Sequence, residues 1–244
     1  MVTILLLGTY FTIETLAIKL KKLIYLSCNK ENKMKIAVIG ANGKSGQLLV
    51  KEALSRGHDV TAIVRKPSSN SDAKAKVLVK DLFQLTYDDL KPFDVIIDAF
   101  GTWTPESLPL HQTSLKHLTD ILSGKPNRLL VVGGAGSLYV NPEHTVRLVD
   151  SPDFPDEFKP LANNMAKALD QLRTCDDVQW TYLSPAIEFI ADGARTGHYT
   201  IGGEQFLVNS QGKSQISYAD YAIAMIDEAE KAQHIKQRFT VVAE

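Results

Sequence analysis

The feature that most constrains the fold is a glycine-rich turn between a predicted strand and a predicted helix. Residues 35–46 run Lys-Ile-Ala-Val-Ile-Gly-Ala-Asn-Gly-Lys-Ser-Gly, so Gly40, Gly43 and Gly46 follow a short apolar run. Beyond the turn, apolar residues recur at helical spacing until Gly57, a residue type that commonly ends a helix. The segment therefore predicts a strand, a tight turn and a helix in immediate succession.

Such a turn is typical of dinucleotide sites. Gly40 would allow the tight turn, Gly43 would let the backbone approach a pyrophosphate, and Gly46 would let the helix pack closely on the sheet. The helix N-terminus would attract the phosphates. The residues expected to bind the cofactor here are Gly40, Asn42, Gly43, Lys44, Ser45 and Gly46. The alternative is a tight strand-to-helix turn that binds nothing.

The rest of the chain alternates short apolar strands with helix-length segments. Strands are expected at 58–65, 76–79, 94–99, 128–133, 180–183 and 239–242, and helices at 107–122, 161–175 and 218–232. This alternation predicts an α/β fold, a Rossmann-type doubly wound parallel sheet in a single domain, with ligands at the carboxyl ends of the strands.

The length of 244 residues and the hydrophobic content of 44% suit one such domain, which we place at 34–244. Residues 1–33 are expected to be an N-terminal extension, because the apolar segment 4–26 carries Glu14 and three lysines and Met34 directly precedes the first strand. An amphipathic helix on a membrane surface or on a partner is the alternative, and a membrane span is not expected.

Charge and cysteine content exclude other classes of protein. With 27 basic and 28 acidic residues the net charge is −1, so the basic surface that nucleic-acid binding needs is not expected. Cys28 and Cys175 lie far apart in sequence and make no disulfide framework, which favours the cytoplasm. His111 and His117 fall on different helix faces, so no metal site is expected. Nothing in the sequence indicates an oligomeric state.

Arg65 and Lys66 at the end of the second strand bear on the cofactor. An acidic residue there would bind the ribose 2′-hydroxyl of NAD, whereas an arginine accommodates a 2′-phosphate. We therefore favour NADP(H) over NAD(H), the alternative being a solvated basic loop end. Asp81 and Leu82, after the third strand, are expected at the adenine edge, and a helix cap is the alternative for Asp81.

The segment after the fourth strand is expected to follow the cofactor toward its acceptor. Ala99, Phe100 and Gly101 would let the backbone approach the middle of the cofactor, while Thr102 and Trp103 would contact the substrate. Phe100 and Trp103 could form a stacking surface, or they could be ordinary core aromatics. After a later strand, Pro185 would line the nicotinamide side of the cleft, unless it only ends a strand.

Five motifs carry a resemblance to a known family. They lie at 40–46, 131–138, 183–186, 195–200 and 216–222. With them the chain resembles an atypical short-chain dehydrogenase/reductase of the NADH-flavin reductase group, related to the biliverdin/flavin reductases, from residue 35 to the C-terminus. The resemblance implies a nicotinamide-dependent reductase. The name of the group points to NADH, which conflicts with the charge argument at Arg65.

The usual catalytic residues of short-chain dehydrogenases are present only in part. Ser137 could supply the serine that follows the fifth strand, in a catalytic role or in contact with the substrate, or it could only cap a turn. Lys167 could supply the lysine, but Asn163 stands where the proton-donating tyrosine would be. Carbonyl reduction needs a proton donor at the developing alkoxide, and an asparagine cannot supply one.

These observations favour an NAD(P)H-dependent oxidoreductase that transfers hydride to a flavin, a quinone or a similar small conjugated acceptor. A flavin would then be a substrate rather than a bound prosthetic group. The alternative is a non-catalytic NADP(H)-binding redox sensor, and a sugar-nucleotide epimerase is disfavoured by the incomplete tyrosine–lysine pair. The proline-rich segment 140–160 is expected to be a lid over the substrate edge, or else a surface excursion.

Overall fold

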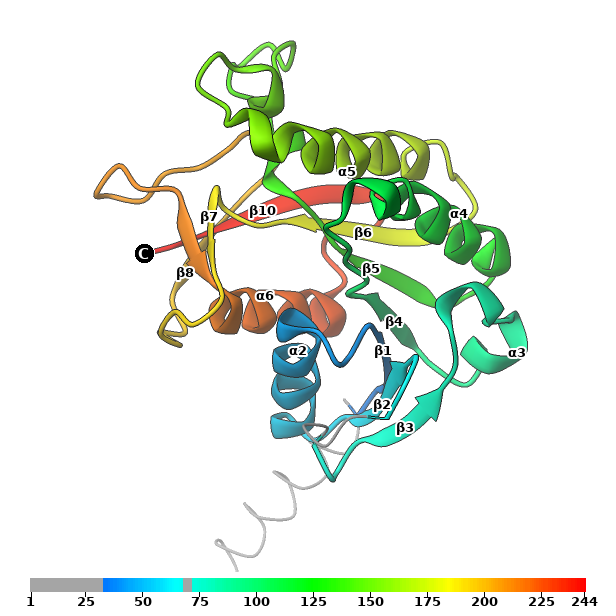
Figure 1. The fold of residues 1–244 in the computed structure, drawn as a ribbon. Coiled ribbons are helices and arrows are strands. Elements are labelled where there is room, and N and C mark those ends of the chain that lie inside the picture. The colour runs from blue at the N-terminus through cyan, green and yellow to red at the C-terminus, as the bar shows by residue number, and fades with distance from the viewer. Residues whose placement is uncertain (1–32, 68–71) are drawn as a thin grey trace, which may run out of the picture. The chain divides into compact units, whose positions relative to one another are not determined.

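The computed structural model describes residues 33–67 and 72–244, and its main element is an eight-stranded sheet (Figure 1). The order is β3-β2-β1-β4-β5-β6-β10-β8. The strands are β1 (Lys35–Ile39), β2 (Asp59–Val64), β3 (Lys76–Val79), β4 (Val95–Asp98), β5 (Arg128–Val132), β6 (Gln179–Ser184), β8 (Tyr199–Gly202) and β10 (Gln237–Ala243). All neighbouring pairs are parallel except β8 and β10, so the predicted parallel sheet is confirmed with one antiparallel edge strand.

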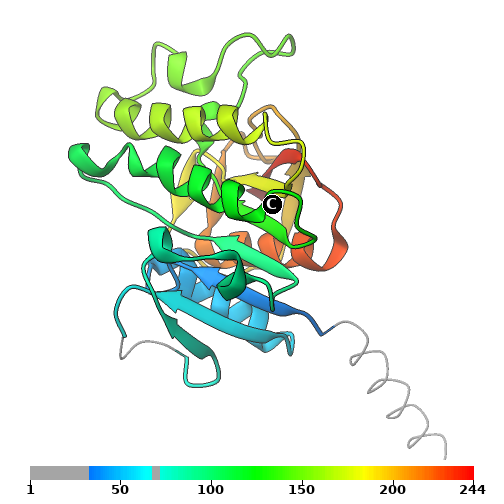
Figure 2. The same cartoon turned by 90° about the vertical axis from the view of Figure 1, so that its right-hand side faces the viewer.

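Helices cover both faces of the sheet (Figures 1 and 2). One face carries α2 (Lys44–Ser55) and α6 (Tyr218–Lys231), and the other carries α4 (Leu110–Leu122) and α5 (Lys159–Leu172), with the short α3 (Tyr87–Leu90) after β3. The predicted doubly wound arrangement is therefore confirmed. Helix α4 begins three residues later than expected because a 3₁₀ turn, Pro105–Ser107, precedes it.

The sheet separates two apolar core layers. In β1, Ile36 and Val38 pack toward α2 and α6, while Ala37 and Ile39 pack toward α4 and α5. All four are buried. Because alternate side chains of a strand point to opposite faces, a sheet that is covered on both sides needs apolar residues at every position. This explains the unbroken apolar runs of the sequence.

Three short strands were not expected from the sequence. β8 closes one edge of the large sheet, and β7 (Glu188–Ile190) pairs with β9 (Gln215–Ser217) in a small parallel sheet. Each is three or four residues long and has exposed or half-exposed positions. Their pairing is set by the long-range path of the chain, so no local alternation of apolar residues indicates them.

The proline-rich segment 140–160 is attached to helix α5. Arg147 donates two hydrogen bonds to the Asp170 carboxylate, at 2.6 and 2.9 Å, and this pairing raises the pKa of the guanidinium. The Asn141 Oδ1 accepts the backbone N–H groups of Thr145 and Val146, which fixes the turn internally. The role of segment 140–160 as a lid stays a prediction.

Two of the sequence motifs bind each other. Asp220, buried in the first turn of α6, accepts hydrogen bonds from the Thr196 N–H at 2.9 Å, the Thr196 hydroxyl at 2.8 Å and the Gly197 N–H at 2.8 Å. Beside it, Arg195 forms an ion pair with Glu52 of α2 at 3.0 Å. These residues therefore attach the segment before β8 to the core helices.

Strand β3 forms the other edge of the large sheet. Val77 and Val79 are 47% and 51% exposed. The lysines at the two ends of the strand are both in ion pairs, Lys76 with Asp59 at 2.8 Å and Lys80 with Asp89 at 2.6 Å. This edge thus presents a short apolar stretch between two charged groups.

The described fold coincides with one compact unit, Met34–Glu244. The expectation for residues 1–33 falls almost wholly outside the described residues and stays a prediction. Within the described parts of the chain, no helix is long and apolar enough to cross a membrane.

Asp220→Ala is expected to destabilise the protein by about 3 kcal/mol, because three hydrogen bonds of about 1 kcal/mol each lose their acceptor. Chemical denaturation of the full chain measures this change. Asp120→Ala is the matched control, since its exposed ion pair with Lys116 should contribute about 0.5 kcal/mol. Equal stability of the two variants would contradict the structural role of Asp220.

Candidate functional site

The glycine turn lies at the carboxyl edge of the sheet and is too tightly packed for other residues. Gly40 has a φ of +74°, and a Cβ there would lie 2.6 Å from the Ala99 carbonyl oxygen. A Cβ at Gly46 would lie 2.4 Å from the Gly40 carbonyl oxygen. The turn therefore brings β1, β4 and α2 together more closely than any side chain allows.

The N-terminus of α2 has the character of an anion site. Gly43 precedes the helix with extended backbone, no side chain caps its first turn, and that turn holds no acidic residue. Asn42, Gly43 and Lys44 are exposed, and Ser45 is half-buried. Unsatisfied N–H groups and the positive end of the helix dipole are therefore available to a phosphate.

The ends of β1 and β2 meet at this site. The Asn42 side-chain amide donates to the Lys66 carbonyl oxygen at 2.8 Å, so the glycine turn is joined to the loop that carries Arg65. Both basic side chains are exposed, and neither makes an ion pair with another described residue. The structure thus brings Arg65 and Lys66 beside the turn, as a 2′-phosphate site would require, although a solvated loop end has the same exposure.

Asp81 and Leu82 have structural roles at the end of β3. The Asp81 carboxylate accepts the Phe83 N–H at 2.9 Å and caps a 3₁₀ turn, the alternative considered from the sequence. Leu82 is buried in the core layer beneath α4. Contact of these residues with adenine stays a prediction.

The segment after β4 runs directly beside the glycine turn. Phe100 is half-buried and meets the His111 ring edge-on at a centroid distance of 5.8 Å. Gly101 is exposed, and Trp103 is 72% exposed, so Trp103 is not a core aromatic. Thr102 is half-buried, with its hydroxyl bonded to that of Ser107. Ala99 and the Phe100 N–H lie directly against Gly40, and contact of this segment with a cofactor stays a prediction.

Ser137 lies after β5, and Pro185 follows β6. The Ser137 hydroxyl is buried and has no hydrogen-bond partner in the described part of the chain, so it does not cap a turn. Its carbonyl oxygen accepts a long hydrogen bond, 3.4 Å, from Arg238, whose guanidinium also pairs with Glu204. Pro185 is buried. All predicted site residues thus lie at the carboxyl edge, although Ser137 is covered and does not line the pocket described next.

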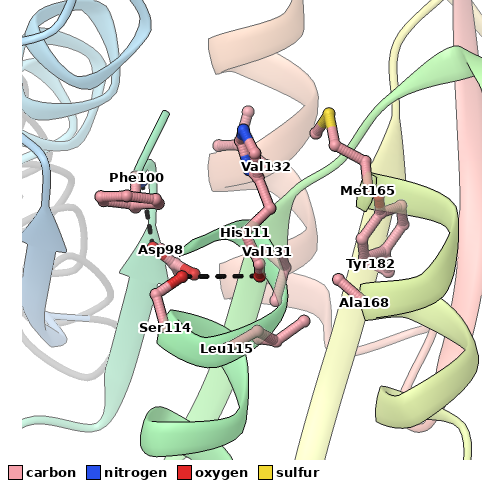
Figure 3. A pocket seen from close by; sticks show the side chains of 10 residues that line it. All are labelled: Asp98, Phe100, His111, Ser114, Leu115, Val131, Val132, Met165, Ala168 and Tyr182. Carbon is pink, nitrogen blue, oxygen red and sulfur yellow. Dashed lines mark hydrogen bonds between the residues drawn. The ribbon is translucent and has the colours of Figure 1, made fainter. Parts of the chain in front are cut away.

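A small pocket opens between the sheet and helices α4 and α5 (Figure 3). It is lined by Asp98, Phe100, His111, Ser114, Leu115, Val131, Val132, Met165, Ala168 and Tyr182. Asp98 is buried, and its Oδ1 accepts the Phe100 N–H at 3.0 Å. Because burial disfavours the charged carboxylate, the pKa of Asp98 is raised to about 6.

Two further polar side chains of this pocket, His111 and Tyr182, form hydrogen bonds with the backbone of neighbouring loops. The His111 Nε2 lies 3.1 Å from the Thr102 carbonyl oxygen and must donate to it. Burial lowers the pKa of this histidine, so the ring is neutral and its Nδ1 is an acceptor. The Tyr182 hydroxyl accepts the Gly134 N–H at 3.1 Å, and burial raises its pKa to about 12, so it keeps its proton.

The sequence analysis did not identify Asp98 or His111 as site residues. The signal for Asp98 was an acidic residue at the end of an apolar strand. Nothing in the local sequence around His111 indicates that it lines the same pocket. Asn163 and Lys167 are both exposed on α5, and neither lines this pocket. Among the described residues, no group of three metal-ligating side chains comes together.

Comparison with known proteins shows which family the chain belongs to. A family model described as NAD(P)H-binding matches residues 40–231. The uncharacterised protein YwnB of Bacillus subtilis is 50% identical over 212 residues, which are 86% of this chain and 99% of YwnB. The matched region begins at the glycine turn and includes every predicted cofactor residue.

Solved structures agree in fold and sequence. A putative NADH-flavin reductase from Streptococcus pneumoniae is 54% identical with a TM-score of 0.84, over 86% of this chain and all of that chain. A putative epimerase from Bacteroides thetaiotaomicron is 36% identical with a TM-score of 0.76, over 86% of this chain and 97% of the other. On the family match and these identities, the chain belongs to the NAD(P)H-binding family of Rossmann-fold proteins.

Proposed function

We propose that the protein is an NAD(P)H-dependent oxidoreductase that transfers hydride to a flat conjugated acceptor such as a flavin or a quinone. The observation that carries the proposal is the uncapped N-terminus of α2 behind a glycine turn that packs against the start of the loop after β4, the loop in which Trp103 is exposed. The first feature suits the cofactor's pyrophosphate and the second suits a planar acceptor. The similarity to the Streptococcus pneumoniae protein supports the same reaction class.

The residues present fit a dinucleotide. Gly40 and Gly46 leave no space for side chains, so the backbone can approach the pyrophosphate, while Asn42, Lys44 and Ser45 surround the open helix end. The bound nicotinamide supplies the hydride, and the chain has to hold two flat rings together and exclude water. Phe100, Thr102 and Trp103 form the acceptor side of this arrangement, and a flavin binds there as substrate.

The missing tyrosine limits the acceptor class. Asn163 stands where the proton donor of carbonyl-reducing relatives would be, and it is exposed on α5. Reduction of a conjugated acceptor spreads the new negative charge over the ring system and needs a weaker donor. The same observation fits a second candidate, an NADP(H)-binding redox sensor without turnover, and it disfavours an epimerase despite the name of the Bacteroides relative.

NADP(H) is the cofactor that the local charges favour. A guanidinium binds a phosphate in two parallel hydrogen bonds, and the exposed Arg65 makes no ion pair with another described residue. The name of the Streptococcus pneumoniae relative specifies NADH, so the two arguments conflict. We give more weight to Arg65, the side chain that this protein has at the predicted ribose end of the cofactor.

The half-buried free thiol of Cys175 suits the cytoplasm.

The test of function is the initial rate of NADPH and NADH oxidation by the full chain, with FMN, riboflavin and a quinone as separate acceptors. Saturable turnover that requires the protein establishes the reductase and ranks its acceptors. Tight dinucleotide binding without turnover of any acceptor would instead support the sensor.

Arg65→Ala is expected to weaken NADPH binding by about tenfold or more and to leave NADH binding nearly unchanged, because only NADPH loses a charge-assisted hydrogen bond. Fluorescence titration with each dinucleotide measures both affinities. Lys51→Ala, at an exposed position farther along α2, is the control for a general loss of positive charge. Equal affinities of Arg65→Ala and the parent protein for NADPH would remove the argument for NADP(H).

A further inference from the structure

Asp98 is a buried acid whose charge the structure does not compensate. It is 5% exposed, and among the described residues its carboxyl group has one hydrogen-bond partner, the Phe100 N–H at 3.0 Å. An asparagine would make the same bond without the free-energy cost of burying a titratable group. A carboxyl group at this position therefore has a property that the fold does not need, which is an exchangeable proton.

The other residues that line the pocket do not fix the protonation state of Asp98. Helix α4 contributes His111, which is neutral, and Ser114, while helix α5 contributes only Met165 and Ala168. On the sheet, β5 contributes Val131 and Val132, and β6 contributes Tyr182, which keeps its proton. No cation or second carboxylate lines the pocket, so the pKa of Asp98 is raised by burial and opposed only by the hydrogen bond from the Phe100 N–H.

The pocket lies next to the loop after β4, which carries the proposed acceptor residues, and next to the loop after β5. Asp98 and His111 hold the loop after β4 through the Phe100 N–H and the Thr102 carbonyl oxygen. Tyr182 holds the loop after β5 through the Gly134 N–H. In Figure 3 the Asp98 carboxyl lies beside Ser114, and the His111 ring extends from α4 toward the side of Val132 and Met165, with both residues lining the pocket. The pocket has room for about one water molecule, and Asp98, His111 and Tyr182 are polar residues of its lining.

We propose that Asp98 is the proton donor of the reductase, delivering its proton to the reduced acceptor through a water held between Asp98, His111 and Tyr182. The inference rests on the proposed function and adds to it the donor that the missing tyrosine would otherwise supply. The neutral His111 Nδ1 and the Tyr182 hydroxyl orient the water, and Phe100 lines the same pocket on the side of the proposed acceptor.

The reaction balances without a further reagent. Hydride from NAD(P)H reduces a quinone by two electrons and gives NAD(P)⁺ and a hydroquinone monoanion. The Asp98 O–H bond breaks, and the proton passes through the water to the anionic oxygen, which yields the hydroquinone and the Asp98 carboxylate. A proton from solvent restores Asp98 after the product leaves. An acid whose pKa lies near the working pH is suited to this cycle.

The first test compares Asp98→Asn with the wild type in steady-state turnover of a quinone and of FMN from pH 5 to 9, in the full chain. The variant keeps the acceptor for the Phe100 N–H. Its kcat with the quinone should fall roughly 100-fold, the size of a general-acid contribution. The fall should be smaller with FMN, because the reduced flavin anion is the weaker base. NADPH affinity should be unchanged, and the decline of kcat toward high pH should disappear.

Asp94→Asn is the matched control, since Asp94 precedes the same strand, is exposed and accepts the Lys35 N–H at 2.7 Å. It should retain wild-type rates and the wild-type pH profile. An Asp98→Asn variant that keeps the wild-type pH profile, or that loses the same factor with both acceptors at every pH, would show that Asp98 only positions the loop and would overturn the donor role. Absence of turnover in the wild type would overturn the reductase itself, and with it the donor.

A second measurement tests the proton on Asp98 without turnover. The raised pKa means that folded protein binds this proton up to about pH 6, whereas the unfolded chain releases it near 3.8. Wild-type stability should therefore fall relative to Asp98→Asn as pH rises from 4 to 7, and the two denaturation curves should converge below about pH 4. Parallel stability profiles across this range would overturn the proposal, because Asp98 would then be an ordinary ionised carboxylate.

Discussion

The approach of the glycine turn to the end of β4 is the constraint on which the rest of the structure depends. The Gly40 and Gly46 backbones lie where a side chain would overlap the carbonyl oxygens of Ala99 and Gly40. This contact fixes the start of α2, aligns β1 with β4 and places the loop after β4 beside the open helix end. The same backbone contacts therefore position both the predicted cofactor site and the loop proposed to bind the acceptor.

Most of the fold could be predicted because it follows from local patterns. Seven of the strands and the four long helices correspond to apolar runs and helical spacing, and Gly57, with a φ of +86°, follows the end of α2 as expected. Strands β7, β8 and β9 could not be predicted. They are short, and they exist because residues far apart in sequence meet, as when Asp220 binds the backbone of Thr196 and Gly197.

The candidate site divides in the same way. The glycine turn and the basic pair Arg65–Lys66 are contiguous motifs, so their position at the sheet edge followed from the sequence. The Asp98 pocket is different, because it forms only when α4 and α5 cover β4, β5 and β6. Ser137 lies after β5 as expected, yet its hydroxyl is buried, has no hydrogen-bond partner among the described residues and does not line the pocket.

The open edge at β3 bears on how copies of this protein behave at high concentration. Unpaired backbone groups along an edge strand can pair with another sheet, and the half-exposed Val77 and Val79 would favour such contact. The strand is only four residues long, and a lysine stands at each end. Pairing with a second such edge would have to bury these charged groups or break their ion pairs with Asp59 and Asp89. The sequence of β3 therefore protects the protein from edge-to-edge aggregation while the strand itself remains apolar.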